Sequence, residues 1–255
     1  MRRLPAGLVL PRGFTGRWNH EYPKLGHVHG YQIDGINCPT VTEVLQTIAK
    51  PPLLYWYGQQ ASLEALDGSE HLLMERDAAI RWLANAGNRK KDEAARLGSA
   101  IHRYADELAT TGTMPLVHPD AVPFVASLAA WVADHPHLVA LSEFVVGHRT
   151  LAQFYMGTAD QIMDIDGELL LVDLKTGKGI WPEHRLQLAA YRYADFMLSD
   201  GIESAIPTVD GCAILHVRPE GTELIRVKAE REEFEAFLAC LDLWRWYDQH
   251  KEGDE

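Results

Sequence analysis

GTADQIMDIDGELLLVDLKTGKG, residues 157–179, consists of two strand-like segments on either side of the turn dipeptide Asp166-Gly167. Segments of this kind around Asp-Gly predict a β-hairpin. Asp160 lies six residues before Asp166, and Asp173 lies six residues after Gly167. Because residues equally distant from the turn face each other in an antiparallel pair, the two carboxylates are predicted to meet at one end of a sheet.

Two facing carboxylates need a counter-ion, because like charges placed opposite each other destabilise a sheet. A divalent cation would supply it, and hard carboxylate ligands suit Mg²⁺ or Mn²⁺. Lys175 follows Asp173 by two positions and therefore lies on the same face of the strand. The alternative is a surface salt bridge between these two residues. The apolar run ELLLV before them is typical of a central strand, where charges seldom occur without a function, and it favours the metal site.

The segments around this hairpin predict an α/β (α+β) fold, with one mixed central sheet flanked by helices. Strands are expected at 139–148, 154–165, 168–176, 211–219 and 223–229. Helices are expected between and after them at 183–198 and 231–249. The first half of the chain is mostly helical, after a short hairpin at 28–38, with helices expected at 40–48, 53–66, 70–86, 90–110 and 120–134.

Length and composition are consistent with a single soluble domain. The chain has 255 residues, 47% of them hydrophobic, which is enough for a full core. We expect one domain over 1–255, with a helical region at 28–138 that carries His102, a sheet core at 139–229 that holds the site, and a C-terminal helix at 230–255. Pro5 and Pro11 break the apolar run near the N-terminus, so an intracellular protein with no membrane association is expected.

The cysteines and the net charge exclude several classes of protein. Cys38, Cys212 and Cys240 are scattered and form no CxxC pair, which argues against a disulfide framework, a zinc knuckle and a four-cysteine iron–sulfur cluster. The 24 Lys and Arg residues against 36 Asp and Glu residues leave a net charge of −12, which disfavours a protein that coats nucleic acid. Local basic segments still permit an enzyme that acts on nucleic acid.

Two positive segments are candidates for phosphate contacts. One is the N-terminal arm at 1–31, and the other precedes His102 on the same predicted helix and contains Arg89, Lys90, Lys91 and Arg96. A solvated helix face is an equally open interpretation of the second segment. Trp56, Tyr57 and Trp82 are interpreted as core residues of the helical half, with stacking on unpaired bases as the alternative.

Two further features lie on predicted helices. His102 occurs in RLGSAIHRYADEL, and a lone helical histidine is more often structural than a metal ligand. Gln187 and Tyr191 are four residues apart and therefore share one helix face. An amphipathic helix with an aromatic residue in the core explains the apolar neighbours of Gln187, but not Gln187 itself.

Taken together, these residues resemble the RecB-like branch of the PD-(D/E)XK nuclease superfamily. Four motifs occur in the family's order, over roughly residues 28–200: G-x-x-x-H at Gly98–His102, G-x-x-D at Gly157–Asp160, (D/E)-x-K at Asp173-Leu174-Lys175, and Q-x-x-x-Y at Gln187–Tyr191. The four cysteines of the members that carry an iron–sulfur cluster have no counterpart here. The resemblance is therefore to the cluster-free members.

The resemblance implies a PD-(D/E)XK nuclease core and a set of residue roles. His102, Asp160, Asp173 and the backbone carbonyl of Leu174 would bind one or two Mg²⁺ or Mn²⁺ ions, which activate a water molecule for attack on a phosphodiester. Lys175 would position or deprotonate that water, so that Asp160, Asp173 and Lys175 are the catalytic residues. Gln187 and Tyr191 would line the path of the DNA. Glu143, at the start of the first core strand, is not included in this site.

The implied activity is that of a metal-dependent DNA exonuclease in recombination, repair or phage DNA processing. Such an enzyme would act in the cytoplasm of a bacterial or phage-infected cell, with DNA as its partner and with a helicase, annealing or recombination protein as a separate chain. Two alternatives stay open: a sequence- or structure-specific endonuclease of the same superfamily, and a catalytically silent nuclease fold that binds DNA or a partner protein.

Overall fold

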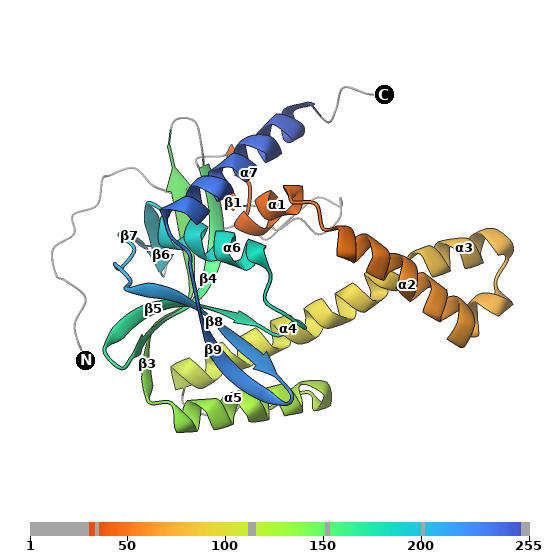
Figure 1. The fold of residues 1–255 in the computed structure, drawn as a ribbon, viewed down its shortest axis with the longest axis horizontal. Helices are drawn as coiled ribbons and strands as arrows, with labels where there is room; N and C mark the ends of the chain where they lie inside the picture. The colour runs from red at the N-terminus through yellow and green to blue at the C-terminus, as the bar shows by residue number, and fades with distance from the viewer. Residues whose placement is uncertain (1–30, 34–35, 112–115, 151–153, 200–201, 251–255) are drawn as a thin grey trace.

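The computed structural model describes residues 31–33, 36–111, 116–150, 154–199 and 202–250 (Figure 1). The predicted N-terminal hairpin is present as strands β1 (Tyr31–Ile33) and β2 (Ile36–Cys38), which pair antiparallel. Its turn at Asp34-Gly35 and the basic arm at 1–30 lie outside the described residues.

A seven-stranded sheet forms the centre of the molecule. Its strands are β3 (His137–Arg149), β4 (Phe154–Ile165), β5 (Glu168–Lys175), β6 (Phe196–Ser199), β7 (Ile202–Ser204), β8 (Gly211–Arg218) and β9 (Gly221–Val227). They are ordered β7-β6-β3-β4-β5-β8-β9. Among these described strands β5 and β8 pair in parallel and the other neighbours pair antiparallel, which confirms the predicted mixed sheet.

The helices confirm that the first half of the chain is mostly helical. They are α1 (Val41–Val44), α2 (Pro51–Asp67), α3 (Arg76–Ala84), α4 (Ala86–Thr111), α5 (Val122–Asp134), α6 (Pro182–Arg192) and α7 (Arg231–His250). Short 3₁₀ turns occupy Leu45–Thr47, Glu70–Leu73 and Pro119–Ala121. Within the described residues, none of these helices combines the length and the apolar character needed to cross a membrane.

The helices cover both faces of the sheet and enclose two apolar cores (Figure 1). On one face α1, α6 and α7 pack over a core that includes Tyr155, Leu188 and Phe237. On the other face α4 and α5 pack over a core that includes Ile101 and Leu215. Strand β5 is apolar on both faces because it lies between these cores, as the run ELLLV predicted.

Helices α2 and α3 form an arm that extends from the sheet and is held by α4 (Figure 1). Neither helix contributes a buried residue among those described. The guanidinium of Arg89 lies 3.6 Å from the centre of the Trp82 ring and donates to the Trp82 carbonyl over 2.7 Å. The Tyr57 ring packs so closely on Gly87 that a Cβ there would lie 2.1 Å from it. Tyr57 and Trp82 therefore join the arm to α4 rather than filling a buried core.

The predicted helix over 183–198 is wrong at its C-terminal end. Helix α6 ends at Arg192, and Phe196–Ser199 forms the unpredicted strand β6, followed by β7. Asp195 makes the change of direction: its backbone N–H donates to Gly147 and its carboxylate accepts from the Arg149 N–H. The segment pairs with the free edge of β3, a tertiary contact that outweighs the helical pattern of its apolar residues.

Replacing Gly157 with Ala should destabilise the fold. The added Cβ would lie 2.6 Å from Tyr191 Cε1 and 3.2 Å from Val41 Cγ2, so the core beneath β4 must shift. Overpacking of this kind costs about 1–3 kcal/mol, measurable by urea unfolding.

The control is Gly58→Ala in α2, where a Cβ meets no atom within 4 Å of the described residues. Removing a glycine from a helix interior should stabilise by about 0.5–1 kcal/mol. A neutral Gly157→Ala variant would contradict the close packing of Tyr191.

Candidate metal centre

Strands β4 and β5 stop pairing at Asp160 and Asp173, the two aspartates that the hairpin is predicted to bring together. Their paired residues run from Ile165–Glu168 to Gln161–Val172, and the same register places Asp160 opposite Asp173. There the Asp160 side chain, and not a backbone carbonyl, accepts the Leu174 N–H, with 2.6 Å between Oδ2 and N. The carboxylates thus face each other where the ladder ends, in the register that the turn predicted.

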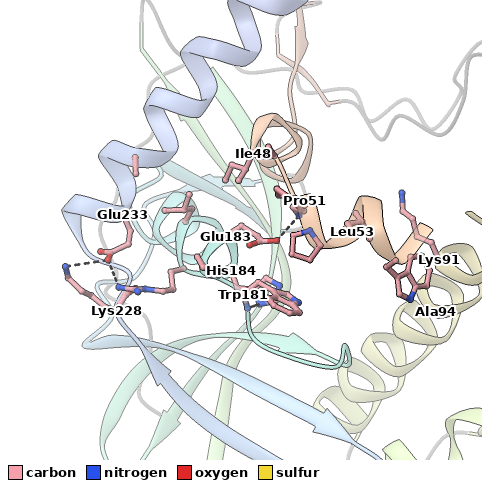
Figure 2. A pocket seen from close by; sticks show the side chains of 18 of the residues that line it. Ile48, Pro51, Leu53, Lys91, Ala94, Trp181, Glu183, His184, Lys228 and Glu233 are labelled. Atoms are coloured by element: carbon pink, nitrogen blue, oxygen red, sulfur yellow. Dashed lines mark hydrogen bonds and ion pairs between the residues drawn. The ribbon is translucent and has the colours of Figure 1, made fainter. Parts of the chain in front are cut away.

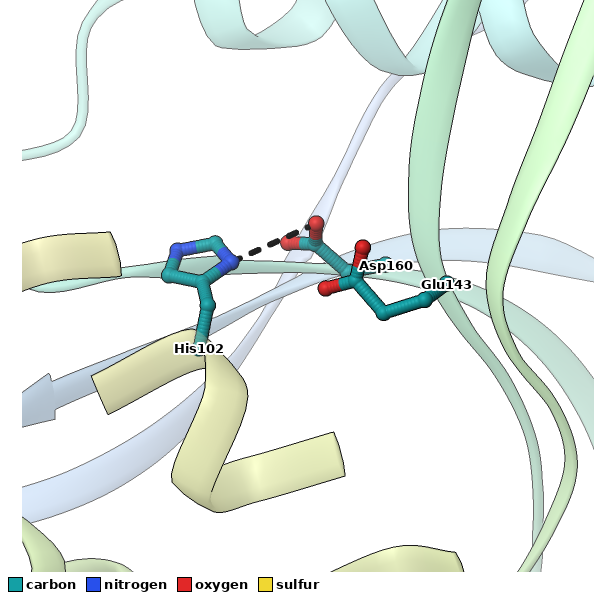
Figure 3. A group of neighbouring side chains, drawn as sticks. All are labelled: His102, Glu143 and Asp160. Atoms are coloured by element: carbon teal, nitrogen blue, oxygen red, sulfur yellow. Dashed lines mark ion pairs between the residues drawn. The ribbon is translucent and has the colours of Figure 1, made fainter. Parts of the chain in front are cut away.

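Two more side chains join Asp160 from other elements (Figure 3). Helix α4 brings His102, whose Nδ1 lies 3.4 Å from Asp160 Oδ1. Strand β3 brings Glu143, which the flanking pairs Ser142–Gln161 and Phe144–Ala159 place opposite Asp160. One possible ligand atom from each of His102, Glu143 and Asp160 lies within 4.8 Å of the other two. Such a spacing would allow one ion to contact all three side chains.

Asp173 and Lys175 complete the cluster on β5. Asp173 is 2% exposed, and its Oδ2 lies 2.5 Å from the Lys175 ammonium. The Lys175 ammonium is therefore the counter-ion of this buried carboxylate. A cation ligated by Asp173 would share Oδ2 with that ammonium or take its place.

The charges in the cluster determine the pKa values of its members. Burial raises the pKa of Asp173 to about 6, although Lys175 opposes this effect. Burial also acts to raise the pKa of Asp160, but His102 and Lys175 outweigh it and hold that pKa below its usual value. Burial lowers the pKa of Lys175, and Asp173 and Asp160 reverse this to a net increase. Asp160 is therefore ionised and Lys175 protonated at neutral pH.

His102 and Glu143 respond to the same Asp160 charge. Burial lowers the pKa of His102, but Asp160 outweighs burial and raises it above 6.5. Glu143 is exposed at the rim of the cluster, where partial desolvation and then the charge of Asp160 raise its pKa to about 7. Lys175 interacts with two of the three carboxyl groups, Asp160 and Asp173, and the third, Glu143, lies beside Asp160. An added cation would offset the repulsion between Asp160 and Glu143.

Glu143 lies at a backbone irregularity that the sequence did not predict. Its φ is +48°, a left-handed conformation that is unfavourable for a residue with a side chain. In a regular strand, residues three positions apart point to opposite faces of the sheet. Leu141 and Phe144, before and after Glu143, nevertheless pack against the same core, and so do Ala159 and Ile162 of β4. The strand alternation is therefore interrupted at both Glu143 and Asp160. The one signal in the sequence is an acidic residue within the apolar run SEFVV.

The residues predicted to contact DNA are spread over several environments. Gln187 donates from Nε2 to the Tyr191 hydroxyl over 3.0 Å, while the Tyr191 ring is buried against Gly157. Among the basic residues of α4, Arg89 is engaged with the arm, Lys90 pairs with Glu93 at 3.1 Å, and Arg96 donates to the Asp92 carbonyl over 3.3 Å. Lys91 makes no ion pair with the residues described. Arg89 and Tyr191 are thus held in packing contacts, whereas Lys91 is exposed and free of an ion pair with the described residues.

Comparisons with known proteins identify no relative from which a function could be transferred. No family model matches the chain, and no curated protein matches it. Among solved structures, one titled "Crystal structure of SSO0001" shares 12% sequence identity and a TM-score of 0.30. That similarity covers 51% of this chain and 61% of the other. A likeness this low carries no argument, so the chemistry must be inferred from the cluster itself.

The strain at Glu143 predicts an unusual order of stability for two variants. Glycine in a strand is normally less stable than alanine by about 0.5–1 kcal/mol. At position 143 glycine removes the strain of the left-handed backbone, so Glu143→Gly should be more stable than Glu143→Ala by about 1 kcal/mol. Urea unfolding in EDTA measures the difference.

The matched control is Ser142→Gly against Ser142→Ala, one residue earlier in β3. Here the usual order should return, because Ser142 has no positive φ. If the two pairs of variants behave alike, the backbone at Glu143 is not strained.

Proposed function

We propose that this chain is a metal-dependent DNA nuclease with a PD-(D/E)XK-type core, and that it acts as an exonuclease. One observation carries the proposal: α4, β4 and β5 bring His102, Asp160, Asp173 and Lys175 into a single cluster. The motif resemblance rests on the same four residues, and it associates them with phosphodiester hydrolysis. That they converge from positions up to 73 residues apart supports a shared chemical role.

The donor set fits Mg²⁺ or Mn²⁺. Carboxylate oxygens are hard ligands, and the imidazole of His102 is better tolerated by Mn²⁺. We assign His102, Asp160 and Asp173 as ligands, with the Leu174 carbonyl as in the resemblance, and we add Glu143 from the geometry. One or two such ions would lower the pKa of a water molecule and offset the charge that develops on the phosphate.

The side chains of the chain itself would orient the reaction. Asp160 fixes the β5 backbone through the Leu174 N–H, which sets the position of the neighbouring Asp173 and Lys175. The protonated Lys175 would donate a hydrogen bond to the attacking water or to a phosphate oxygen and so stabilise negative charge. Gln187 would contact the DNA, and the buried Tyr191 would hold Gln187 in place through its hydroxyl.

An assay of the purified chain on end-labelled DNA tests this function. Linear and closed circular DNA, single- and double-stranded, would be incubated with Mg²⁺, Mn²⁺ or EDTA. Loss of linear DNA that requires metal, with circles spared, is the result expected of an exonuclease. Nicked or linearised circles would indicate an endonuclease instead, and intact substrates throughout would indicate a silent binding fold.

Lys175→Ala should abolish cleavage while retaining the fold and most of the metal affinity. Loss of a preorganised charge at the reacting group typically costs about 10²–10³-fold in rate. The circular dichroism spectrum and the Mn²⁺ affinity serve as the controls. A variant that cleaves at the wild-type rate would show that Lys175 has no catalytic role.

Asp160→Asn should weaken Mn²⁺ binding, because it removes the charge at the centre of the cluster. We expect a loss of about tenfold or more, equivalent to about 1.4 kcal/mol, measured by isothermal titration calorimetry. Asp164→Asn, four residues along the same strand, is the control, since its carboxylate caps the turn at Gly167. Equal Mn²⁺ affinity of the two variants would place the ion elsewhere.

A further inference from the structure

A large groove lies where the N-terminal parts of several helices come together (Figure 2). It has a volume of about 1040 Å³ and is lined by the start of α2, the N-terminal part of α4 and the starts of α6 and α7. Figure 2 shows Lys228 and Glu233 at one end, Lys91 and Ala94 at the other, and Trp181 between them. This volume slightly exceeds the range of about 300–1,000 Å³ that is typical of small-ligand pockets.

The lining combines aromatic, apolar and cationic side chains. Trp181 is 54% exposed, although a tryptophan of this size is usually well buried. Trp56, Pro51 and Leu53 provide further apolar surface in the same groove. An open indole face beside lysines is the arrangement that lets a protein stack on a base while it contacts the adjoining phosphates.

The charge of the groove is opposite to that of the whole molecule. Five basic residues line it against three acidic ones, whereas the chain carries a net charge of −12. Several of the basic residues are engaged locally, such as Lys50 with Glu183 at 2.8 Å and Arg185 with Glu233 at 2.8 Å. Lys91 makes no ion pair with any residue that the structure describes, so it is available to an anionic ligand.

One face of α4 connects the groove to the metal centre. Lys91 and Ala94 line the groove, Gly98 lies against the Thr176 hydroxyl, and His102 belongs to the cluster. These residues are separated by three or four positions, so they follow a single stripe along the helix. A nucleic acid strand that lies along this stripe of α4 would pass directly from the groove to the proposed metal ligands.

A short loop makes the second connection, from Lys175 to Trp181. The ring of His216 is hydrogen-bonded through Nε2 to the Gly177 carbonyl at 2.7 Å, which holds the loop against β8. The backbone N–H of Trp181 donates to His184 Nδ1 over 3.2 Å, and helix α6 begins at Pro182. These two hydrogen bonds therefore fix the position of the loop that joins Lys175 to the exposed Trp181.

We propose that this groove binds single-stranded DNA next to the cleavage site, with Trp181 stacked on an unpaired base and Lys91 on a backbone phosphate. Single strands are favoured over duplex because the faces of paired bases are already stacked on their neighbours and are closed to an indole. The inference rests on the proposed function for the identity of the polymer as DNA. The inference adds to that function the requirement that the DNA strand be unpaired where it enters the groove.

Binding can be tested without metal, which separates it from cleavage. The fluorescence anisotropy of a labelled oligothymidylate of about 12 nucleotides would be measured with the full chain in EDTA. Trp181→Ala should weaken binding about 5- to 100-fold, whereas Trp181→Phe should retain most of the affinity, because an aromatic face remains. Trp246→Ala is the control, since Trp246 is similarly exposed on α7 at 59% but does not line the groove.

Two further measurements identify which part of the oligonucleotide each residue contacts. An oligonucleotide with abasic sites retains the phosphates but offers no base, so the effect of Trp181→Ala should disappear on it. Lys91→Ala should lower the slope of log affinity against log salt by about 0.7, the value for one phosphate contact on a single strand. Arg81→Ala on α3, outside the groove, should leave the slope unchanged.

The outcomes separate this proposal from the proposed nuclease activity. If the wild-type chain cleaves DNA but Trp181→Ala binds the oligonucleotide as well as Trp246→Ala does, the groove proposal is wrong and the activity stands. If the groove variants lose affinity while the wild-type chain cleaves nothing with any metal, the groove proposal stands and the activity is wrong. Tighter binding of a duplex than of the single strand would also overturn the proposal for the groove.

Discussion

The hydrogen bond from the Leu174 N–H to the Asp160 carboxylate is the contact on which the centre of the molecule depends. It takes the place of a backbone bond at the point where β4 and β5 stop pairing. Asp160 is thereby turned toward β5, close to the second buried carboxylate of Asp173, while His102 and Lys175, with a smaller contribution from this hydrogen bond, keep it ionised. An arrangement of this kind is unfavourable by itself, and it is stabilised by Lys175, His102 and any bound cation.

The helical half contributes more to the site than a covering layer. Helix α4 packs on α5 and β3, supplies His102 at its centre, and carries the α2–α3 arm along its first turns. The groove with Trp181 is formed where that arm meets α6 and α7. The proposed chemistry therefore depends on the packing of α4 against α5 and β3, and the proposed DNA path depends also on the position of the arm.

Most of the fold could be predicted from local sequence patterns. The strand bounds at 154–165 and the register of the Asp166-Gly167 hairpin follow from alternation and turn chemistry, which are short-range effects. Strand β6 could not be predicted, because only the free edge of β3 makes its apolar residues a strand. Glu143 was missed for a similar reason: its place in the cluster depends on a left-handed backbone and on pairing across β4, neither of which has a sequence signature.

The stripe on α4 has a consequence for how this chain can change in length. Lys91 and His102 are eleven residues apart, which is about three helical turns at 3.6 residues per turn. Inserting one residue between them would rotate the two side chains relative to each other by about 100° and lengthen the rod by about 1.5 Å. The length of α4 between these two residues therefore fixes both the distance and the relative orientation of the groove and the proposed metal ligands. Related chains should conserve the spacing along this segment, whereas the parts of the α2–α3 arm that contact neither α4 nor the groove can vary.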